Sequence, residues 1–254
     1  MKLIAIEEHF LTSEIRKVWK EFADDDPIHT LDFGQTDILL DEIGKERLSH
    51  MDETGVDVQV LSLTTPGVHN LKEQSGELSK HTNDWLATII ASNPLRFQGF
   101  ATLPTPLPNL AAPELERAVS KLGFKGAMLC GRTREKNLDH KDYWPIFECA
   151  AALKVPLFIH PQIPQKPVIN SYYSGFSEQV DLAFSTFGLG WHYEAGIQFM
   201  RMILAGVFDE FPELQIILGH WGEVVLFYTE RFGSLSRVAK LKHPVVEYAN
   251  RQRT

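Results

Sequence analysis

Short apolar runs rich in β-branched residues alternate along the chain with longer stretches in which apolar residues recur at helical spacing. The strand-like runs cover residues 3–7, 56–63, 97–103, 126–130, 156–160 and 214–219. The helical stretches cover residues 45–54, 77–93, 109–122, 143–153, 192–208 and about 222–240. This alternation predicts an α/β fold in which a parallel sheet is connected by crossover helices.

Turn-forming residues support these boundaries. Predicted helices end at Gly55, at Asn93-Pro94 and at Gly123. Residues 22–44 and 163–190 have no clear period and are rich in Asp, Gly or Pro, so we expect two long loops there. Both follow strands, and in a (β/α)8 TIM-type barrel such loops lie on the face that carries active sites.

The number of predicted strands is lower than a closed barrel needs. The pattern gives six strands, whereas a TIM-type barrel has eight. After residue 219 only one further helix and a polar tail, residues 243–254, can be recognised. We therefore expect a single TIM-type barrel domain over residues 1–254, with the last two βα units missing from this chain.

The end of the first strand carries the first candidate metal ligands. Side chains alternate across a strand, so Leu3, Ala5, Glu7 and His9 should share one face. A carboxylate and an imidazole aimed at one point suit a divalent cation, which offsets the cost of burying the charge. The alternative is a solvent-exposed strand end on which both side chains are hydrated.

Two later strands also end in histidine. Pro161 favours extended backbone at His160, so the strand should run to that residue. His220 follows another apolar strand, between Gly219 and Gly222, which allow close backbone approach. Taken alone, each histidine is better explained as a structural residue at a strand end. However, parallel barrel strands open into the same mouth, which predicts that Glu7, His9, His160 and His220 converge there.

Other residues give weaker signals. His192, at the start of a helix, and Glu223, after the last strand, are candidate substrate contacts together with His220. Cys130 fits a buried, inert thiol. The chain has no GxGxxG, P-loop or GxSxG motif, which argues against nucleotide cofactors and serine-hydrolase chemistry.

The composition disfavours some classes of binding partner and favours one cellular compartment. The formal net charge of −8 argues against nucleic acid and anionic membranes as partners. Two cysteines without a CxxC pair favour a reducing compartment. No apolar run reaches the roughly 18 residues that a membrane span needs, so we expect a cytoplasmic protein.

Several stretches of the sequence resemble those of a known family. The stretches Ile6-Glu7-Glu8-His9-Phe10, Phe158-Ile159-His160-Pro161 and Ile217 through Glu223 resemble signatures of the decarboxylase branch of the amidohydrolase superfamily. That branch includes gamma-resorcylate, 2,3-dihydroxybenzoate and aminocarboxymuconate semialdehyde decarboxylases. Residues 126–129 and 206–212 are similar too, and the resemblance extends from residue 1 to about 247.

The resemblance implies one divalent metal ion, bound by Glu7, His9 and His160. We expect zinc first, with manganese or magnesium as alternatives, and no organic cofactor. His160 and His220 would be the catalytic histidines, with His220 beside the substrate, and the chain would form homodimers or homotetramers. The family also carries an aspartate at the end of strand eight. No residue here matches it, since Asp209 lies on a predicted helix.

The expected reaction is metal-dependent, non-oxidative decarboxylation of an ortho-hydroxybenzoic acid of the resorcylate or dihydroxybenzoate type. This is a carbon–carbon lyase reaction with a small aromatic carboxylate as substrate. One alternative is a metal-dependent hydrolase of a lactone or amide, in which the metal activates water. The other alternative is a truncated, inactive member of the family, because the matching aspartate is absent.

Overall fold

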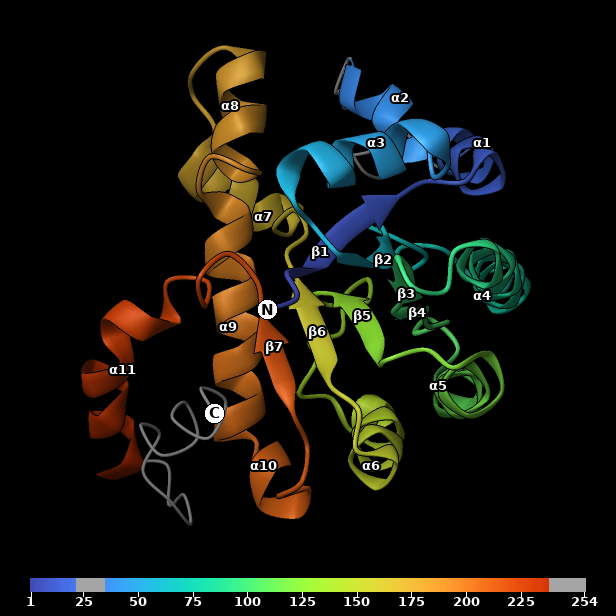
Figure 1. Ribbon diagram of the computed structural model, residues 1–254. Coiled ribbons are helices and arrows are strands. Elements are labelled where there is room, and N and C mark those ends of the chain that lie inside the picture. Colours follow the sequence, from blue (N-terminus) through green and yellow to red (C-terminus); the bar gives the residue numbers. More distant parts are fainter. Residues whose placement is uncertain (22–34, 238–254) are drawn as a thin grey trace. The chain divides into compact units, whose positions relative to one another are not determined.

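The computed structural model describes residues 1–21 and 35–237. Its contacts divide into two compact units, Met1–Met128 and Leu129–Thr254. In both units strands alternate with helices, as Figure 1 shows, and every pairing between the strands described below is parallel. The predicted α/β alternation is therefore confirmed, whereas the single barrel domain over residues 1–254 stays a prediction.

The first unit contains most of the strands. Its strands are β1 (Ile4–Phe10), β2 (Val58–Leu63), β3 (Phe97–Gly99), β4 (Ala101–Thr102) and β5 (Ala127–Cys130), the last of which runs into the second unit. Its helices are α1 (Ser13–Glu21), α2 (Gln35–Asp41), α3 (Lys45–Thr54), α4 (Ser75–Ser92) and α5 (Pro108–Leu122). The strands pair as β1-β2-β3 and as β4-β5.

The third predicted strand is divided at Phe100, where the backbone changes partner. The amide of Phe100 donates to the carbonyl of Leu61 on β2, and the amide of Ala101 donates to the carbonyl of Gly126. Gly99 precedes this change, and a Cβ on it would lie 2.9 Å from the Leu86 side chain. The glycine therefore lets α4 pack closely on the strand.

The second unit contains β6 (Leu157–His160) and β7 (Ile216–Leu218), paired in register from Leu157 with Ile216. Its α-helices are α6 (Trp144–Leu153), α7 (Lys166–Val168), α8 (Glu178–Ser185), α9 (Gly190–Leu204), α10 (Val207–Glu210) and α11 (Val225–Gly233). Up to Arg237, where the described residues end, it also contains two 3-10 helices (Lys141–Tyr143 and Ser234–Arg237) and a π-helix (Ile169–Tyr173).

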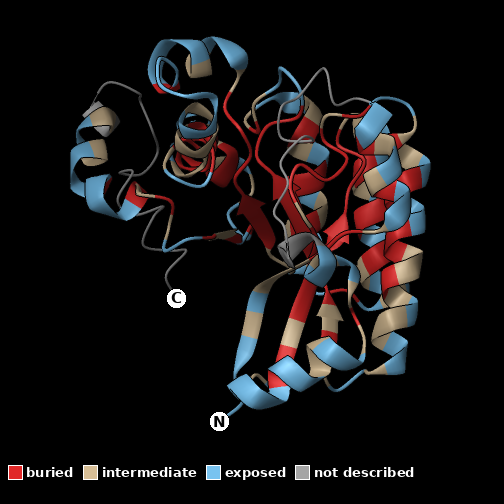
Figure 2. Cartoon of the chain, turned by 90° about the horizontal axis from the view of Figure 1, so that it is seen from above, coloured by how far each residue is buried: buried red, intermediate tan, exposed pale blue. Residues whose placement is uncertain are grey.

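Burial follows the expected pattern within each unit. Figure 2 shows buried residues along the strands and on the strand-facing sides of helices, with exposed residues on the outer helix faces. Leu61 and Phe97 are fully buried in the first unit, and Phe147 and Ile159 are buried in the second. Among the described residues no helix is both long and apolar enough to cross a membrane.

Three sequence expectations about local structure are wrong. Residues 163–190 are not a loop, because they include α7, the π-helix and α8. Part of residues 22–44 is helical as α2, while residues 22–34 lie outside the described residues. The last helix begins at Val225 and not at Gly222. In α8 nearly all side chains are at least partly exposed, so that helix carries little apolar periodicity to detect.

Candidate metal and proton-transfer site

Glu7 lies in a β-bulge of β1, between Ala5 and Glu8, and His9 follows it. Ala5 pairs with Gln59, but His9 pairs with Ser62, so β1 contains one more residue than β2 over this stretch. The extra residue places Ala5 and His9 on opposite faces, and the expectation that strict alternation holds from Leu3 to His9 is wrong. Bulges re-aim side chains in this way, and here the bulge determines where the candidate ligands point.

The first unit brings Glu7 and His9 together. A carboxylate oxygen of Glu7 and a ring nitrogen of His9 lie within 4.8 Å of each other. The Nδ1 atom of His9 lies 3.2 Å from the hydroxyl of Ser62, which is fully buried. When Nδ1 carries the proton and donates to this hydroxyl, the lone pair of the neutral ring is on Nε2, the form that binds a metal.

Arg47 supports the backbone of the same strand end. Its Nη2 donates to the carbonyl oxygen of His9 at 2.7 Å. Burial raises the pKa of the neighbouring Glu8 carboxyl, and the charge of Arg47 opposes this rise. The guanidinium therefore both holds the backbone at His9 and stabilises a partly buried carboxylate.

His160 ends β6 in the second unit, as Pro161 predicted, and is only 4% exposed. Its Nδ1 lies 2.7 Å from the carbonyl oxygen of Pro161. A carbonyl can only accept, so Nδ1 carries the proton and Nε2 carries the lone pair of the neutral ring. His160 thus has the tautomer of a metal ligand. That it binds the same metal ion as Glu7 and His9 stays a prediction.

The segment after β7 has unusual backbone geometry. The φ angles are 44° at His220, 61° at Trp221, 85° at Gly222, 50° at Glu223 and 61° at Val224. The left-handed backbone conformation is unfavourable for residues other than glycine, most of all for β-branched residues such as valine. The sequence predicted unusual backbone geometry at Gly219 and Gly222. Gly222 has a positive φ angle and Gly219 does not, whereas four non-glycine residues of this segment do. Strain of this kind is often concentrated at functional sites.

This strained segment places Glu223 between two histidines. Its carboxylate is fully buried and accepts from Nδ1 of His220 at 2.6 Å and from Nδ1 of His192 at 2.9 Å. The His220 and His192 side chains are 34% and 27% exposed. A Cβ on Gly196 would lie 2.6 Å from the backbone oxygen of Glu223, so this glycine lets α9 approach closely enough for His192 to reach the carboxylate.

His220 also lies beside the candidate metal ligand of the same unit. The ring centroids of His160 and His220 are 5.6 Å apart, and those of His192 and His220 are 5.0 Å apart. The second unit therefore brings together His160, His220, His192 and Glu223. The substrate contacts predicted for His192, His220 and Glu223 stay predictions, and both carboxylate oxygens of Glu223 are engaged by imidazoles.

Sequence reasoning missed a buried polar network in the segments that follow β5 and β6. The fully buried amide of Gln162 donates to the carbonyls of Cys130 and Arg132, and Arg132 donates to the carbonyl of Ile163 at 2.9 Å. Arg132 also lies 3.4 Å from Glu194, whose pKa is raised by burial, with Arg132 opposing the rise. These bonds tie together the segments that follow β5 and β6. Polar residues directly after apolar strands were the available signal.

Ser62 was missed as well. It lies inside the apolar run 56–63, where a serine is easily taken for a small core residue. Only its register opposite His9 gives it a role. Cys130, by contrast, is buried as the sequence predicted.

Comparison with known proteins identifies the family. The amidohydrolase family model matches residues 40–240. A gamma-resorcylate decarboxylase of Polaromonas is 37% identical over 228 residues, covering 87% of this chain and 67% of the relative.

Two solved structures have folds similar to that of this chain. A dihydroxybenzoic acid decarboxylase of Polaromonas, with bound manganese and 2-nitroresorcinol, has a TM-score of 0.83 and 33% identity, covering 98% of this chain and 76% of that one. The 5-carboxyvanillate decarboxylase of Novosphingobium aromaticivorans, complexed with manganese and a nitrobenzoic acid, has a TM-score of 0.84 and 29% identity, covering 93% and 70%. With its parallel α/β fold of the TIM-barrel type, this chain belongs to the amidohydrolase family, in the branch of the hydroxybenzoate decarboxylases.

Proposed function

We propose that the protein catalyses metal-dependent, non-oxidative decarboxylation of an ortho-hydroxybenzoic acid of the resorcylate or dihydroxybenzoate type. The observation that carries the proposal is the His220–Glu223 pair, an imidazole held by a fully buried carboxylate beside His160. The similarity to decarboxylases that act on hydroxybenzoates supports the choice of substrate.

Glu7, His9 and His160 would hold one divalent ion. The donor set fits, because Ser62 and the Pro161 carbonyl hold the Nδ1 atoms of the two imidazoles and so favour the tautomer that coordinates through Nε2. The chemistry supplied by such an ion is charge stabilisation and orientation for the carboxylate and ortho-hydroxyl oxygens of the substrate.

The identity of the metal is part of the proposal. Two imidazoles and a carboxylate suit zinc, which the sequence favoured, and they also accommodate manganese. The manganese in the two solved relatives supports manganese for this chain. Metal-free protein reloaded with zinc, manganese or magnesium, one at a time, should regain activity most fully with the native ion.

His220 would handle the proton. Because Glu223 accepts from Nδ1, the ring of His220 is held in one orientation with Nε2 available for proton transfer. In the proposed reaction His220 acts as the imidazolium, and its Nε2 proton moves to the ring carbon that bears the carboxylate, which leaves the neutral ring with Nδ1–H on Glu223. The bond from that carbon to the carboxylate then breaks, its electron pair restores the aromatic ring, and carbon dioxide leaves.

Assembly and location complete the proposal. We expect a homodimer or homotetramer, because Trp221, Phe227 and Tyr172 of the second unit are large apolar side chains left exposed. A cytoplasmic location agrees with two cysteines that are both free thiols. Light scattering coupled to gel filtration tests the first expectation.

The decisive experiment identifies the products of the reaction and the origin of the new ring hydrogen. The metal-loaded protein is incubated with 2,6-dihydroxybenzoate in D₂O, and carbon dioxide and the ring product are measured. Decarboxylation predicts resorcinol with one deuterium at the former carboxyl position. His220→Asn and His160→Asn should lose turnover, whereas His50→Gln, at an exposed position of α3, should keep it. Turnover of a lactone or amide with oxygen from labelled water would instead identify a hydrolase.

A further inference from the structure

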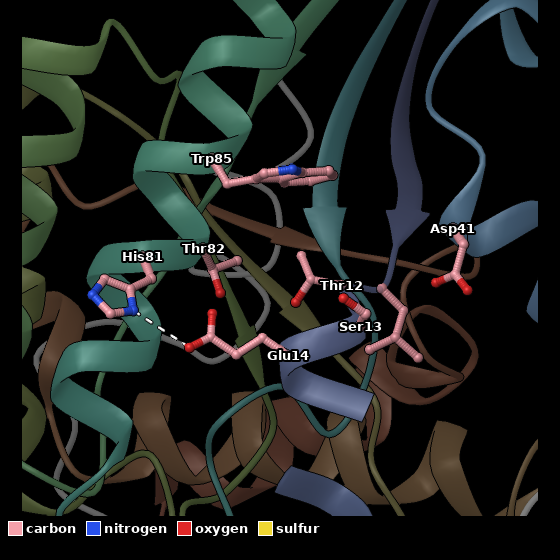
Figure 3. Close-up of a pocket in the computed structure, with 8 residues that line it drawn as sticks. Thr12, Ser13, Glu14, Asp41, His81, Thr82 and Trp85 are labelled. Atoms are coloured by element: carbon pink, nitrogen blue, oxygen red, sulfur yellow. Dashed lines mark hydrogen bonds and ion pairs between the residues drawn. The ribbon is translucent and has the colours of Figure 1, made fainter. Parts of the chain in front are cut away.

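The first unit contains a pocket outside the candidate metal site. It has a volume of about 400 Å³ and lies between the start of α1, the end of α2 and one face of α4 (Figure 3). Its lining consists of Leu11, Thr12, Ser13, Glu14, Asp41, His81, Thr82 and Trp85.

The pocket is on the helix-covered side of β1. Phe10 packs against Trp85, with ring centroids 5.2 Å apart. The preceding residue, His9, faces Ser62 instead. Successive side chains of a strand point to opposite faces, so Trp85 and the pocket lie away from the face that carries His9.

The lining is acidic and carries one aromatic wall. Glu14 lies 3.4 Å from Nδ1 of His81, and Asp41 pairs with Arg16 at 3.3 Å. Figure 3 shows the Trp85 ring above the Glu14 carboxylate and the Thr12 side chain. A carboxylate combined with the face of an indole is the recognition chemistry of organic cations. Among the described residues that line the pocket none is a lysine or an arginine, and Arg16 engages Asp41 but not Glu14.

Thr82 provides an independent indication of a ligand. The residue is 2% exposed, and its hydroxyl is buried without a hydrogen-bond partner. Figure 3 shows this hydroxyl turned toward the Glu14 carboxylate at the pocket wall. A buried hydroxyl without a partner is unfavourable, and an N–H donor bound between Thr82 and Glu14 would satisfy it.

We propose that this pocket binds a small primary amine in its ammonium form. The ammonium group donates to the Glu14 carboxylate and to the Thr82 hydroxyl, and its short alkyl chain lies against Trp85 and Leu11. Asp41, which pairs with Arg16, borders the same pocket. This assignment concerns binding alone and does not depend on the decarboxylase proposal.

Three matched probes test the chemistry by isothermal titration of the whole chain. They are 1-butylammonium, 1-butanol, which lacks the charge, and butyltrimethylammonium, which lacks the N–H donors. Only 1-butylammonium should bind well, and each of the other two should bind at least about tenfold more weakly. Equal binding of 1-butanol would overturn the charge assignment, and equal binding of butyltrimethylammonium would overturn the role of Thr82.

Variants locate the site. Glu14→Gln and Thr82→Val should each weaken 1-butylammonium binding by about tenfold or more, and the exposed position of Glu14 makes the first variant safe for folding. Glu116→Gln, at an exposed position of α5, is the control and should bind as the parent does. Binding that is absent in the parent, or unchanged in Glu14→Gln, overturns the proposal.

Discussion

The fully buried carboxylate of Glu223 accepts a hydrogen bond from Nδ1 of His220, three residues earlier in the chain, at 2.6 Å. The other carboxylate oxygen accepts a hydrogen bond from His192, so each oxygen has one imidazole donor. A carboxylate removed from water is costly unless such donors compensate for it. The arrangement therefore fixes the tautomer and the orientation of both rings.

Replacing Glu223 by glutamine should disable proton transfer while preserving size. The amide can accept from only one imidazole, and its NH₂ group faces the donor of the other, so one ring must change tautomer or turn away. We expect kcat for decarboxylation to fall by about 10²-fold or more, with a smaller change in KM. Steady-state kinetics measure both, and circular dichroism checks the fold. A variant with parental kcat would remove Glu223 and His220 from the mechanism.

The metal site can be probed through Ser62. Its hydroxyl lies 3.2 Å from Nδ1 of His9, so Ser62→Ala removes the group that orients this ring. Loss of such a supporting group typically costs about 10–100-fold in metal affinity. Competition with a chelator measures the affinity for manganese and zinc. Ser49→Ala, at an exposed position of α3, is the matched control. Equal affinities in both variants would show that the Ser62 hydroxyl does not orient a metal ligand.

The sequence predicted the elements that bury strong apolar runs. Residues 56–63 and 156–160 appear as strands β2 and β6 with nearly the expected bounds, and residues 45–54 form α3 with the bounds expected. The two strands form as their own pattern dictates because each buries a continuous apolar run. Helix α3 buries only Met51, and its end at Gly55 follows from the left-handed backbone of that glycine. The bulge at Glu7 could not be predicted in this way, because it depends on the register with β2 and not on the sequence of β1 alone.

The candidate site was predicted in part. Histidines at strand ends pointed to His160 and His220, but the sequence could not reveal that Glu223 bridges His220 and His192. That contact depends on four non-glycine residues held at positive φ, a conformation that local preference disfavours. Tertiary packing overrides local preference there, with α9 close against the segment through Gly196.

Gly196→Ala tests that close approach. The added Cβ would lie 2.6 Å from the backbone oxygen of Glu223, so α9 and the strained segment must separate. Overpacking of this kind typically costs about 1–3 kcal/mol of unfolding free energy, and kcat should fall because His192 and His220 lose their common carboxylate. Gly233→Ala, where a Cβ meets nothing within 4 Å, should leave both quantities unchanged. If the two alanine variants behave alike, the packing of α9 does not hold the site.

His69 predicts how stability depends on pH. The residue is 1% exposed, and burial lowers its pKa from 6.5 to about 4. The unfolded chain therefore binds a proton as pH falls through 6.5, while the folded chain does so only near pH 4. The stability that neutral His69 provides is complete above pH 6.5 and is lost as pH falls toward 4. The shift of about 2.5 pH units corresponds to about 3 kcal/mol.

Urea unfolding at pH 7 and at pH 4.5 measures this contribution. The parent should lose more unfolding free energy than His69→Gln over this interval, by about 2 kcal/mol, since pH 4.5 lies short of the end of the transition. The glutamine variant starts from lower stability, because it places an amide where a neutral ring was packed. His50→Gln is the matched control, since His50 is exposed and its replacement should leave the pH dependence of the parent intact. Parallel pH profiles for the parent and His69→Gln would mean that His69 titrates alike in the folded and unfolded chains, and another group would then have to account for any acid sensitivity.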